Sequence, residues 1–158
     1  MTAAEIDLDK WLWTLPAGRS KNKRARVTPL LGLARTIVAA RIDDGLLFSA
    51  ETGVPLTSAS IGDALHSRRS KSPIAAYTTH DLRRTAATMM YEMGISKDVI
   101  GAVVGHGSDD KGSRTLIRHY LKSDLVERKA RALEAWDAHL RAIVAGEPVD
   151  NVVRFHHG

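Results

Sequence analysis

The sequence predicts an α+β fold that is mainly α, with a small antiparallel β-meander near the N-terminus. Three observations lead to this prediction. Two short segments rich in β-forming residues, each closed by proline, lie early in the chain. Segments with helical spacing and their own start and stop signals follow them. The length of 158 residues and the hydrophobic share of 44% are those of one soluble domain with a real core.

The first two segments, "KWLWTLP" and "VTPL", predict the two strands of a β-hairpin. Trp11, Trp13 and Leu15 alternate along the first segment, as in a half-buried strand. The stretch between the segments, "RSKNKRAR", is basic, and Asn22 suits the turn within it. We therefore expect a hairpin whose tip carries lysines and can reach toward a phosphate.

The next segments predict two helices separated by an irregular stretch. In "LLGLARTIVAAR" the apolar residues Leu30, Leu33, Ile37 and Val38 recur at helical spacing, and the helix is expected to end before Gly45. "LLFSAETGVPLTS" suggests a short strand and a Gly-Pro turn. A brief helix is then expected in "SIGDALHSRR".

Two further helices are marked by their capping residues. "TTHDLRRTAATMMYEMG" begins with a capping-box pattern, Thr78 to Asp81, and Gly94 suits the position just after its end. "ISKDVIGAVVG" offers Ser96 as the N-cap of the next helix.

A long amphipathic helix is predicted over "DLVERKARALEAWDAHLRAIV". Its expected apolar side consists of Leu125, Leu133, Trp136, Leu140 and Ile143. Residues 146–158 are expected to form a C-terminal tail.

The charge favours a polyanionic partner. The formal net charge is +5 and the sequence pI is about 9.7. The chain has no cysteine, so disulfides and thiolate metal sites are excluded, and no apolar run reaches the roughly 18 residues of a membrane helix. The basic residues expected to contact such a partner are Arg19, Lys23, Arg24, Arg26, Arg68, Arg69, Lys71 and Arg84.

Four side chains suggest chemistry, although each alone has an ordinary structural explanation. His80 and Arg83 are three residues apart on a predicted helix and share a face near its N-terminal end. Arg84 lies about 100° further round and is expected to point elsewhere. His106 follows Gly105 at the end of an apolar helix, and Tyr120 follows a polar loop.

Taken together, these segments resemble the catalytic domain of the tyrosine recombinases, the phage-type integrases. "THDLRRTAATMMYEMGIS", "IGAVVGHGS" and "IRHY" resemble the family's H-x-L-R-R-T block, its Gly-His and its following Tyr. "WTLPAGRSKNKRARVTPL" and "ERKARALEAWDAHL" resemble its basic hairpin block and its C-terminal helix. The resemblance covers the chain from about residue 6 to residue 144 and implies the family's helical catalytic fold.

The resemblance also implies an activity, site-specific DNA recombination through a 3′-phosphotyrosine intermediate, with no metal and no cofactor. The catalytic residues that the resemblance implies are Lys21, His80, Arg83, His106 and the nucleophile Tyr120. Lys23 is the second choice for the hairpin lysine, after Lys21. The partner that the resemblance implies is double-stranded DNA at attachment sites, bound by a homotetramer in the bacterial cytoplasm, at the nucleoid, with no membrane involved.

Two departures from the family pattern qualify this expectation. The loop between His106 and Tyr120 is longer than usual. The family's first catalytic Arg precedes the meander, whereas no Arg precedes Arg19 here. Residues 1–145 are therefore expected to be a partial catalytic domain without the upstream helices and the core-binding domain.

Three alternatives remain at this point. The chain could be a non-enzymatic DNA-binding fragment of an integrase, inactive through loss of the first Arg. It could be a helix-turn-helix module, but its recognition helix would expose the apolar residues Val99, Ile100, Ala102, Val103 and Val104, which suit a core better. A metal-dependent hydrolase is a third alternative, without an H-x-x-x-H motif to support it.

Overall fold

The computed structural model describes residues 1–20, 23–42, 45–49, 53–69, 71, 77–105 and 117–148. Of residue 58 and residues 117–123 it describes the backbone path only. No helix in these ranges is both long enough and apolar enough to cross a membrane.

A three-stranded antiparallel sheet forms the N-terminal part of the fold. Its strands β1 (Ile6–Asp7), β2 (Leu12–Leu15) and β3 (Arg26–Pro29) lie in sequence order, with Trp13 opposite both Ile6 and Thr28. Two short 3₁₀ helices, Ala3–Glu5 and Ala17–Arg19, flank the strands. The predicted β-meander is confirmed.

The strand predictions were less accurate at their edges. Trp11 lies just before β2 with φ of 51°, and its ring contacts the Arg35 guanidinium at 4.3 Å instead of continuing the strand. The short strand expected after Gly45 was wrong, because the described part of that segment makes only the isolated bridges Thr2–Leu46 and Ser49–Pro55.

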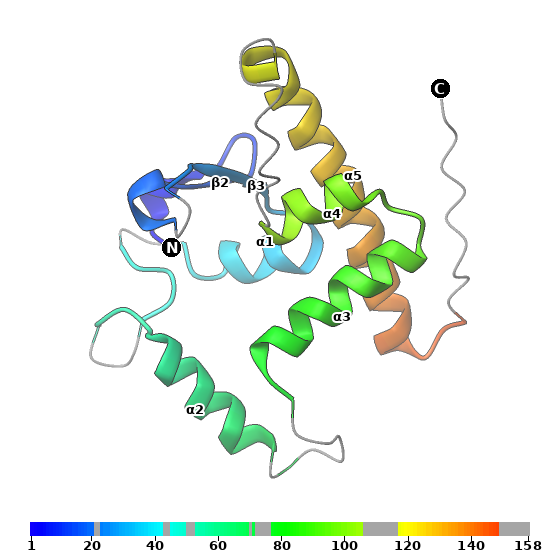
Figure 1. Ribbon diagram of the computed structural model, residues 1–158. Helices are drawn as coiled ribbons and strands as arrows, with labels where there is room; N and C mark the ends of the chain where they lie inside the picture. The colour runs from blue at the N-terminus through cyan, green and yellow to red at the C-terminus, as the bar shows by residue number, and fades with distance from the viewer. Residues whose placement is uncertain are drawn as a thin grey trace.

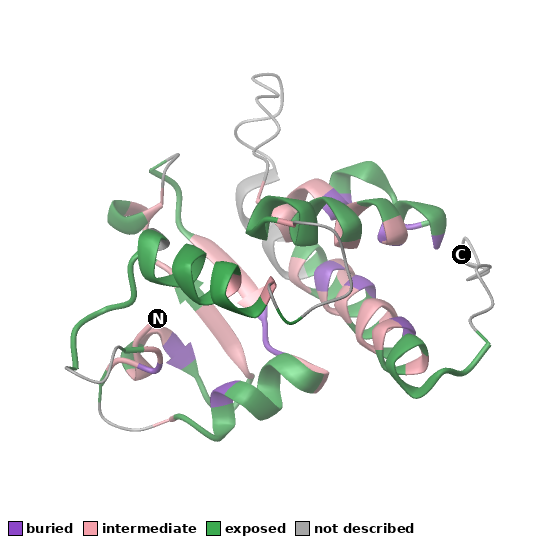
Figure 2. Ribbon diagram, turned by 90° about the horizontal axis from the view of Figure 1, so that it is seen from below, coloured by how far each residue is buried: buried purple, intermediate pink, exposed green. Residues whose placement is uncertain are grey.

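Helices make up most of the described chain, as predicted (Figure 1). The five α-helices in these ranges are α1 (Gly32–Ala39), α2 (Ser58–Arg69), α3 (Thr79–Glu92), α4 (Lys97–Val104) and α5 (Ile117–Ala145). In Figure 1, α3, α4 and α5 lie together on one side, and α2 stands apart from them. Nearly every described residue of α2 is exposed (Figure 2).

The predicted helix caps are confirmed. The Thr78 N–H donates to Asp81 Oδ2 at 2.9 Å, and the Asp81 N–H donates to Thr78 Oγ1 at 3.2 Å, so both halves of the capping box are present. Gly94 follows the C-cap of α3, and Ser96 is the N-cap of α4. These caps fix where α3 begins and ends and where α4 begins.

The core has two centres. Met90, Ile95, Val99 and Ile100 form the first with Ala132, where α3 and α4 pack on α5. The second lies under the sheet and α1 and consists of Ile6, Leu30, Val38 and Leu47. Because Val99 and Ile100 are buried, the apolar residues of α4 serve the core, which argues against the helix-turn-helix alternative.

The buried face of α5 differs from the predicted one. Lys129, Ala132 and His139 are buried, whereas Leu125 and Ile143 are exposed. Similarly, Leu33 and Ile37 of α1 are exposed, and only Val38 of that helix is buried. Helical spacing identified both helices correctly but only part of the sides that they bury, since Val38 is buried and Trp136 packs against the core as predicted.

A carboxylate on α5 holds the start of α1. Leu31, the N-cap of α1, provides no side-chain cap. Asp137 Oδ1 instead accepts a hydrogen bond from the Leu33 N–H at 2.8 Å, and Arg141 Nε donates to Asp137 Oδ2 at 2.7 Å. Gly32, with φ of +48°, lies so close that an added Cβ would collide with the Asp137 carboxylate.

Candidate functional site

An open cavity of about 640 Å³ lies between α3 and α4. The residues that line the cavity lie on one face of α3 and on one face of α4, as their helical spacing indicates. The lining residues are His80, Arg83, Arg84, Ala87, Thr88, Tyr91, Lys97, Ile100, Gly101 and Val104. None of these residues is acidic, and three carry a permanent positive charge.

Two predicted site residues, His80 and Arg83, meet in this cavity. Both are exposed and belong to the first turns of α3, which the Thr78–Asp81 capping box holds in place. Hydrogen bonds from the Thr78 hydroxyl and backbone N–H lower the pKa of the Asp81 carboxyl. That carboxylate is therefore engaged in capping α3 and does not line the cavity.

Arg84 corrects one expectation. It lines the same cavity as His80 and Arg83, although its position about 100° from Arg83 predicted another direction. His80 and Arg84 are four residues apart and therefore neighbours on the helix surface, so the cavity faces a stripe wider than the one His80 and Arg83 define.

Sequence reasoning missed Lys97 and Tyr91. Lys97 begins α4, and its Nζ lies 5.3 Å from the centre of the Tyr91 ring on α3. The contact joins the two walls of the cavity and brings a further cation to it. The spacing of Lys97, Ile100, Gly101 and Val104 on one face of α4 is the signal that could have found it.

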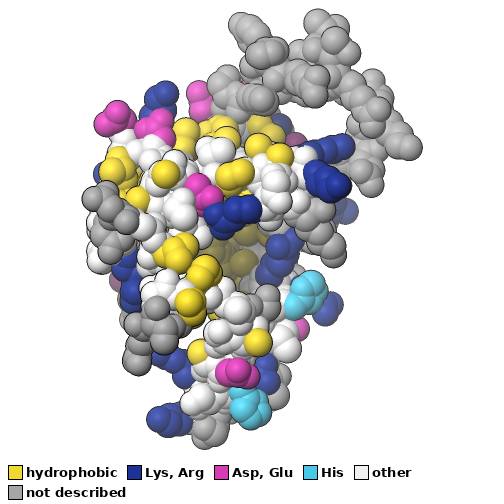
Figure 3. Space-filling model, turned by 90° about the vertical axis from the view of Figure 1, so that its left-hand side faces the viewer, with side chains coloured by type: hydrophobic (Ala, Val, Ile, Leu, Met, Phe, Trp, Pro, Cys, Tyr) yellow, Lys and Arg dark blue, Asp and Glu magenta, His cyan; other side chains and the backbone are white. Residues whose placement is uncertain are grey.

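Apolar residues complete the cavity. Ala87, Ile100 and Val104 belong to the cavity lining and also to the core cluster beneath it. Figure 3 shows a hollow with hydrophobic side chains at its bottom and Lys, Arg and His side chains beside it. Such surroundings strengthen electrostatic interactions with a bound anion, because they offer less water than an open surface does.

The remaining predicted catalytic residues are not brought to this cavity by the described structure. Lys21 and His106 lie outside the described residues, although Gly105, just before His106, caps α4. Tyr120 lies in the first turns of α5, and only its backbone is described. In Figure 1, that end of α5 lies far from the start of α3, which carries His80 and Arg83.

The predicted DNA-contacting residues differ in their surroundings. Lys23, Arg24, Arg68 and Lys71 are exposed. Arg19 is exposed too, but it forms an ion pair with Glu5. Arg69 is half-buried, with its guanidinium 5.7 Å from the centre of the Tyr77 ring.

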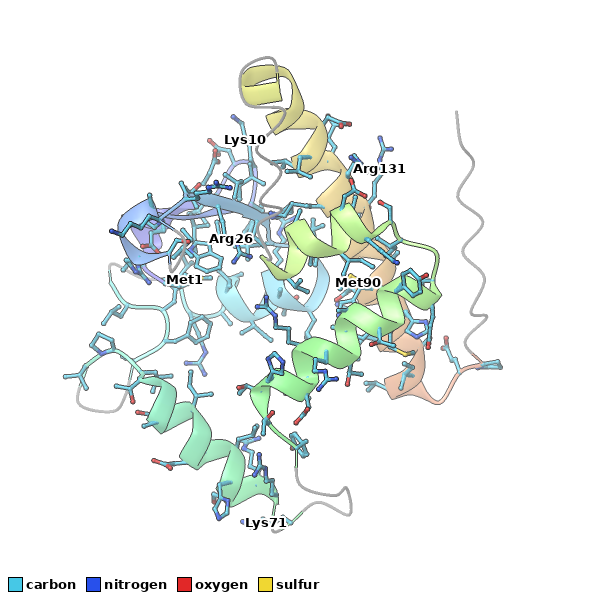
Figure 4. The ribbon with its side chains drawn as sticks, in the orientation of Figure 1. Met1, Lys10, Arg26, Lys71, Met90 and Arg131 are labelled. Atoms are coloured by element: carbon cyan, nitrogen blue, oxygen red, sulfur yellow. The ribbon has the colours of Figure 1, made fainter. Side chains whose placement is uncertain are left out.

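Arg26 is directed inward from β3 (Figure 4). Its Nη2 donates to the Val103 carbonyl at 3.3 Å, and its guanidinium occupies the space that a side chain at Gly105 would need. Gly105 has φ of +76°, which favours glycine there as well. Arg26 therefore bonds to the C-terminal end of α4 in the described structure.

No three His, Asp or Glu side chains gather as metal ligands would within the ranges described above. The ionisable groups that line the cavity include three cations and a histidine, which suit an anionic ligand.

An open cationic cavity on an apolar base, together with the exposed Lys23 and Arg24 of the hairpin, defines a protein suited to binding a phosphate backbone. The Phage integrase family model matches residues 1–130, and the chain belongs to that family.

Among curated proteins, the chain is similar to the prophage integrase IntA of Escherichia coli (strain K12), with 26% identity over 151 residues. That alignment covers 92% of this chain and 35% of IntA, so the chain spans about a third of the length of this relative. No solved structure matches the chain.

Proposed function

We propose that this chain cleaves and rejoins DNA strands by transesterification, as a tyrosine-type site-specific recombinase. Its substrate is double-stranded DNA at an attachment site, and the complete protein acts as a homotetramer on two duplexes. The observation that carries the proposal is the cavity in which His80, Arg83, Arg84 and Lys97 converge without an acidic neighbour among its lining residues.

The cavity supports a defined chemical step. The Tyr120 phenol oxygen attacks the scissile phosphorus, a 3′-phosphotyrosyl bond forms, and the bond to the departing 5′-oxygen breaks. Arg83 presents a planar fork that can bind two phosphate oxygens, and the cations of the cavity offset the charge that develops in the transition state.

Proton transfers complete the step. A phenol with a usual pKa near 10 needs surrounding cations to favour its anion. His80 manages the proton near the nucleophile, His106 donates to a non-bridging oxygen, and Lys21 protonates the leaving 5′-oxygen. Rejoining reverses these transfers and needs no ATP, because the phosphotyrosyl bond conserves the energy of the broken phosphodiester.

Covalent attachment to DNA tests this proposal. We expect a denaturant-resistant adduct when the chain is incubated with nicked DNA carrying its attachment site, and we expect EDTA to leave its yield unchanged. Tyr120→Phe should abolish the adduct, since it removes the attacking oxygen, while non-covalent binding to the same DNA stays unchanged. A Tyr120→Phe variant that still forms the adduct would show that another residue is the nucleophile.

A second candidate function is non-enzymatic DNA binding. The separation in Figure 1 between the end of α5 that carries Tyr120 and the start of α3 favours it. A binding module would give wild-type and Tyr120→Phe proteins with equal affinity and no adduct from either. The same experiment therefore distinguishes the two functions.

The exposed hairpin cations should govern the salt dependence of DNA binding. Replacing Lys23 and Arg24 together by Gln is expected to reduce the slope of log affinity against log salt by about 2, because each phosphate contact contributes about 0.9. The control is the Lys10→Gln, Arg131→Gln double variant, which removes the same charge from other exposed positions. Equal slopes for the two double variants would place the hairpin away from DNA.

A further inference from the structure

Two cations on different elements, Lys129 and Arg26, lie close enough for their charges to interact. Lys129 of α5 is 4% exposed, and its Nζ donates to the Val27 carbonyl of β3. Arg26, the residue before Val27, is half-buried and bonds to the Val103 carbonyl of α4. No Asp or Glu partner is found for either side chain in the described part of the chain.

Burial of this kind is costly for a lysine. Burial, and then the nearby positive charge of Arg26, lowers the pKa of Lys129 to about 8. A lysine used only to fill space would carry this cost without a benefit, because methionine fills the same volume without a charge. The position of Lys129 therefore calls for an explanation beyond packing.

The elements that these cations join are the ones that carry the predicted catalytic residues. The strand β3 continues from the hairpin that contains Lys21. The helix α4 ends at Gly105, directly before His106, and α5 carries Tyr120 in its first turns. Arg26 and Lys129 thus connect the three segments through two side-chain to backbone hydrogen bonds.

Lys129 also marks a change along α5. The described residues from Asp124 to Arg128 are exposed or half-buried, and Lys129 is the first buried one. Among the described side chains, the part of α5 that carries Tyr120 is held from Arg128 and Lys129 onward, because Arg128 Nη2 donates to Asp98 Oδ2 of α4 at 2.6 Å and Lys129 bonds to β3. Because a helix is stiff, a displacement of α5 at Lys129 is transmitted to the end that carries Tyr120.

We propose that Lys129, with Arg26 beside it, is a positioning residue that sets where the Tyr120 end of α5 stands relative to the hairpin and the end of α4. This inference rests on the proposed function for its catalytic consequence. Neither residue contacts the DNA in this role. Misplacing a reacting group by about 1 Å can cost about 10²-fold in rate, so the attachment point matters although it lies nine residues from Tyr120.

The first test separates positioning from binding. Lys129→Met keeps the unbranched stem and removes the ammonium. We expect the rate of adduct formation at saturating DNA to fall about 10- to 100-fold, with the affinity for DNA unchanged when measured in the Tyr120→Phe background. Arg131→Met is the matched control, because Arg131 lies on the same helix but is exposed, and Figure 4 shows it pointing away from the sheet.

The second test measures the position of α5 relative to the sheet and does not depend on catalytic activity. The chain has no cysteine, so Thr14→Cys on β2 and Ser123→Cys on α5 allow nitroxide labels at two chosen sites. We expect Lys129→Met to shift or broaden the distance distribution between the labels, and Arg131→Met to leave it as in the labelled parent. An unchanged distribution in Lys129→Met overturns the inference, whatever its effect on the rate.

The two tests keep the inference distinct from the proposed function. If the parent chain forms no adduct, the proposed function fails, and the distance measurement still decides whether Lys129 positions α5. Should Lys129→Met not fold, Arg26→Gln replaces it in both tests. A normal rate and an unchanged distance distribution in that variant would then overturn the inference.

Discussion

Arg83→Gln is expected to lower the rate of adduct formation by about 10³- to 10⁵-fold at saturating DNA. Arginines that stabilise the transition state of phosphoryl transfer have effects of this size, equivalent to about 4–7 kcal/mol of activation free energy. Arg83 is exposed, so its loss should leave the free energy of unfolding nearly unchanged. Single-turnover adduct formation, measured together with thermal unfolding, checks both expectations.

Two neighbouring variants sharpen this prediction. Arg83→Lys keeps the charge but loses the planar fork, so it should recover only part of the rate. Arg84→Gln removes a cation from the same cavity and should weaken DNA binding while changing the rate at saturating DNA by less than about tenfold. If Arg84→Gln is as slow as Arg83→Gln, the cavity acts as a diffuse positive patch, and the assignment of Arg83 fails.

Features encoded within a few residues could be predicted from the sequence. The Thr78–Asp81 capping box is one, because its two hydrogen bonds join residues three apart. The hairpin is another, since the alternation of Trp13 and Leu15 and the basic turn are local. These features place His80 and Arg83 on the exposed first turns of α3, where both line the cavity between α3 and α4.

Features that depend on distant partners could not be predicted. Lys129 is buried where α5 packs against β3, and Val27, 102 residues away, accepts a hydrogen bond from its ammonium group. Nothing in the sequence of α5 identifies that acceptor, so periodicity assigned Leu125 and Ile143 to the buried side instead. Leu33 and Ile37 show the same limit, since helical spacing does not say which elements cover a helix.

The cavity also required tertiary structure. Lys97 could be assigned to it only once α4 was known to pack against α3, where Lys97 meets Tyr91. Arg84 was placed wrongly because a cavity can face a stripe of the helix surface wider than the line through His80 and Arg83. The sequence grouped Arg26 with the other basic residues of the hairpin, whereas in the structure its guanidinium bonds to the end of α4.

Gly32→Ala is expected to destabilise the fold by about 3 kcal/mol. Gly32 has φ of +48°, a region that costs an L-residue about 1–2 kcal/mol. The new Cβ would also displace the Asp137 carboxylate from the Leu33 N–H, and a hydrogen bond to a charged group contributes about 1.5–3 kcal/mol. The melting temperature should fall by about 6–12 °C for a chain of this size.

The matched control is Gly62→Ala on α2, where an added Cβ meets nothing within 4 Å and alanine favours the helix. That variant should be as stable as the parent chain or slightly more stable. A Gly32→Ala protein with the same melting temperature as Gly62→Ala would contradict the prediction.

The Gly32→Ala, Asp137→Ala double variant separates the two causes. Asp137→Ala alone loses the cap on α1, and Gly32→Ala alone has backbone strain, the collision and the lost cap together. In the double variant the collision is absent and the cap is lost only once, so its destabilisation should be smaller than the sum of the two single effects. Strictly additive effects would show that Asp137 moves aside without cost, and that backbone strain alone makes glycine necessary at position 32.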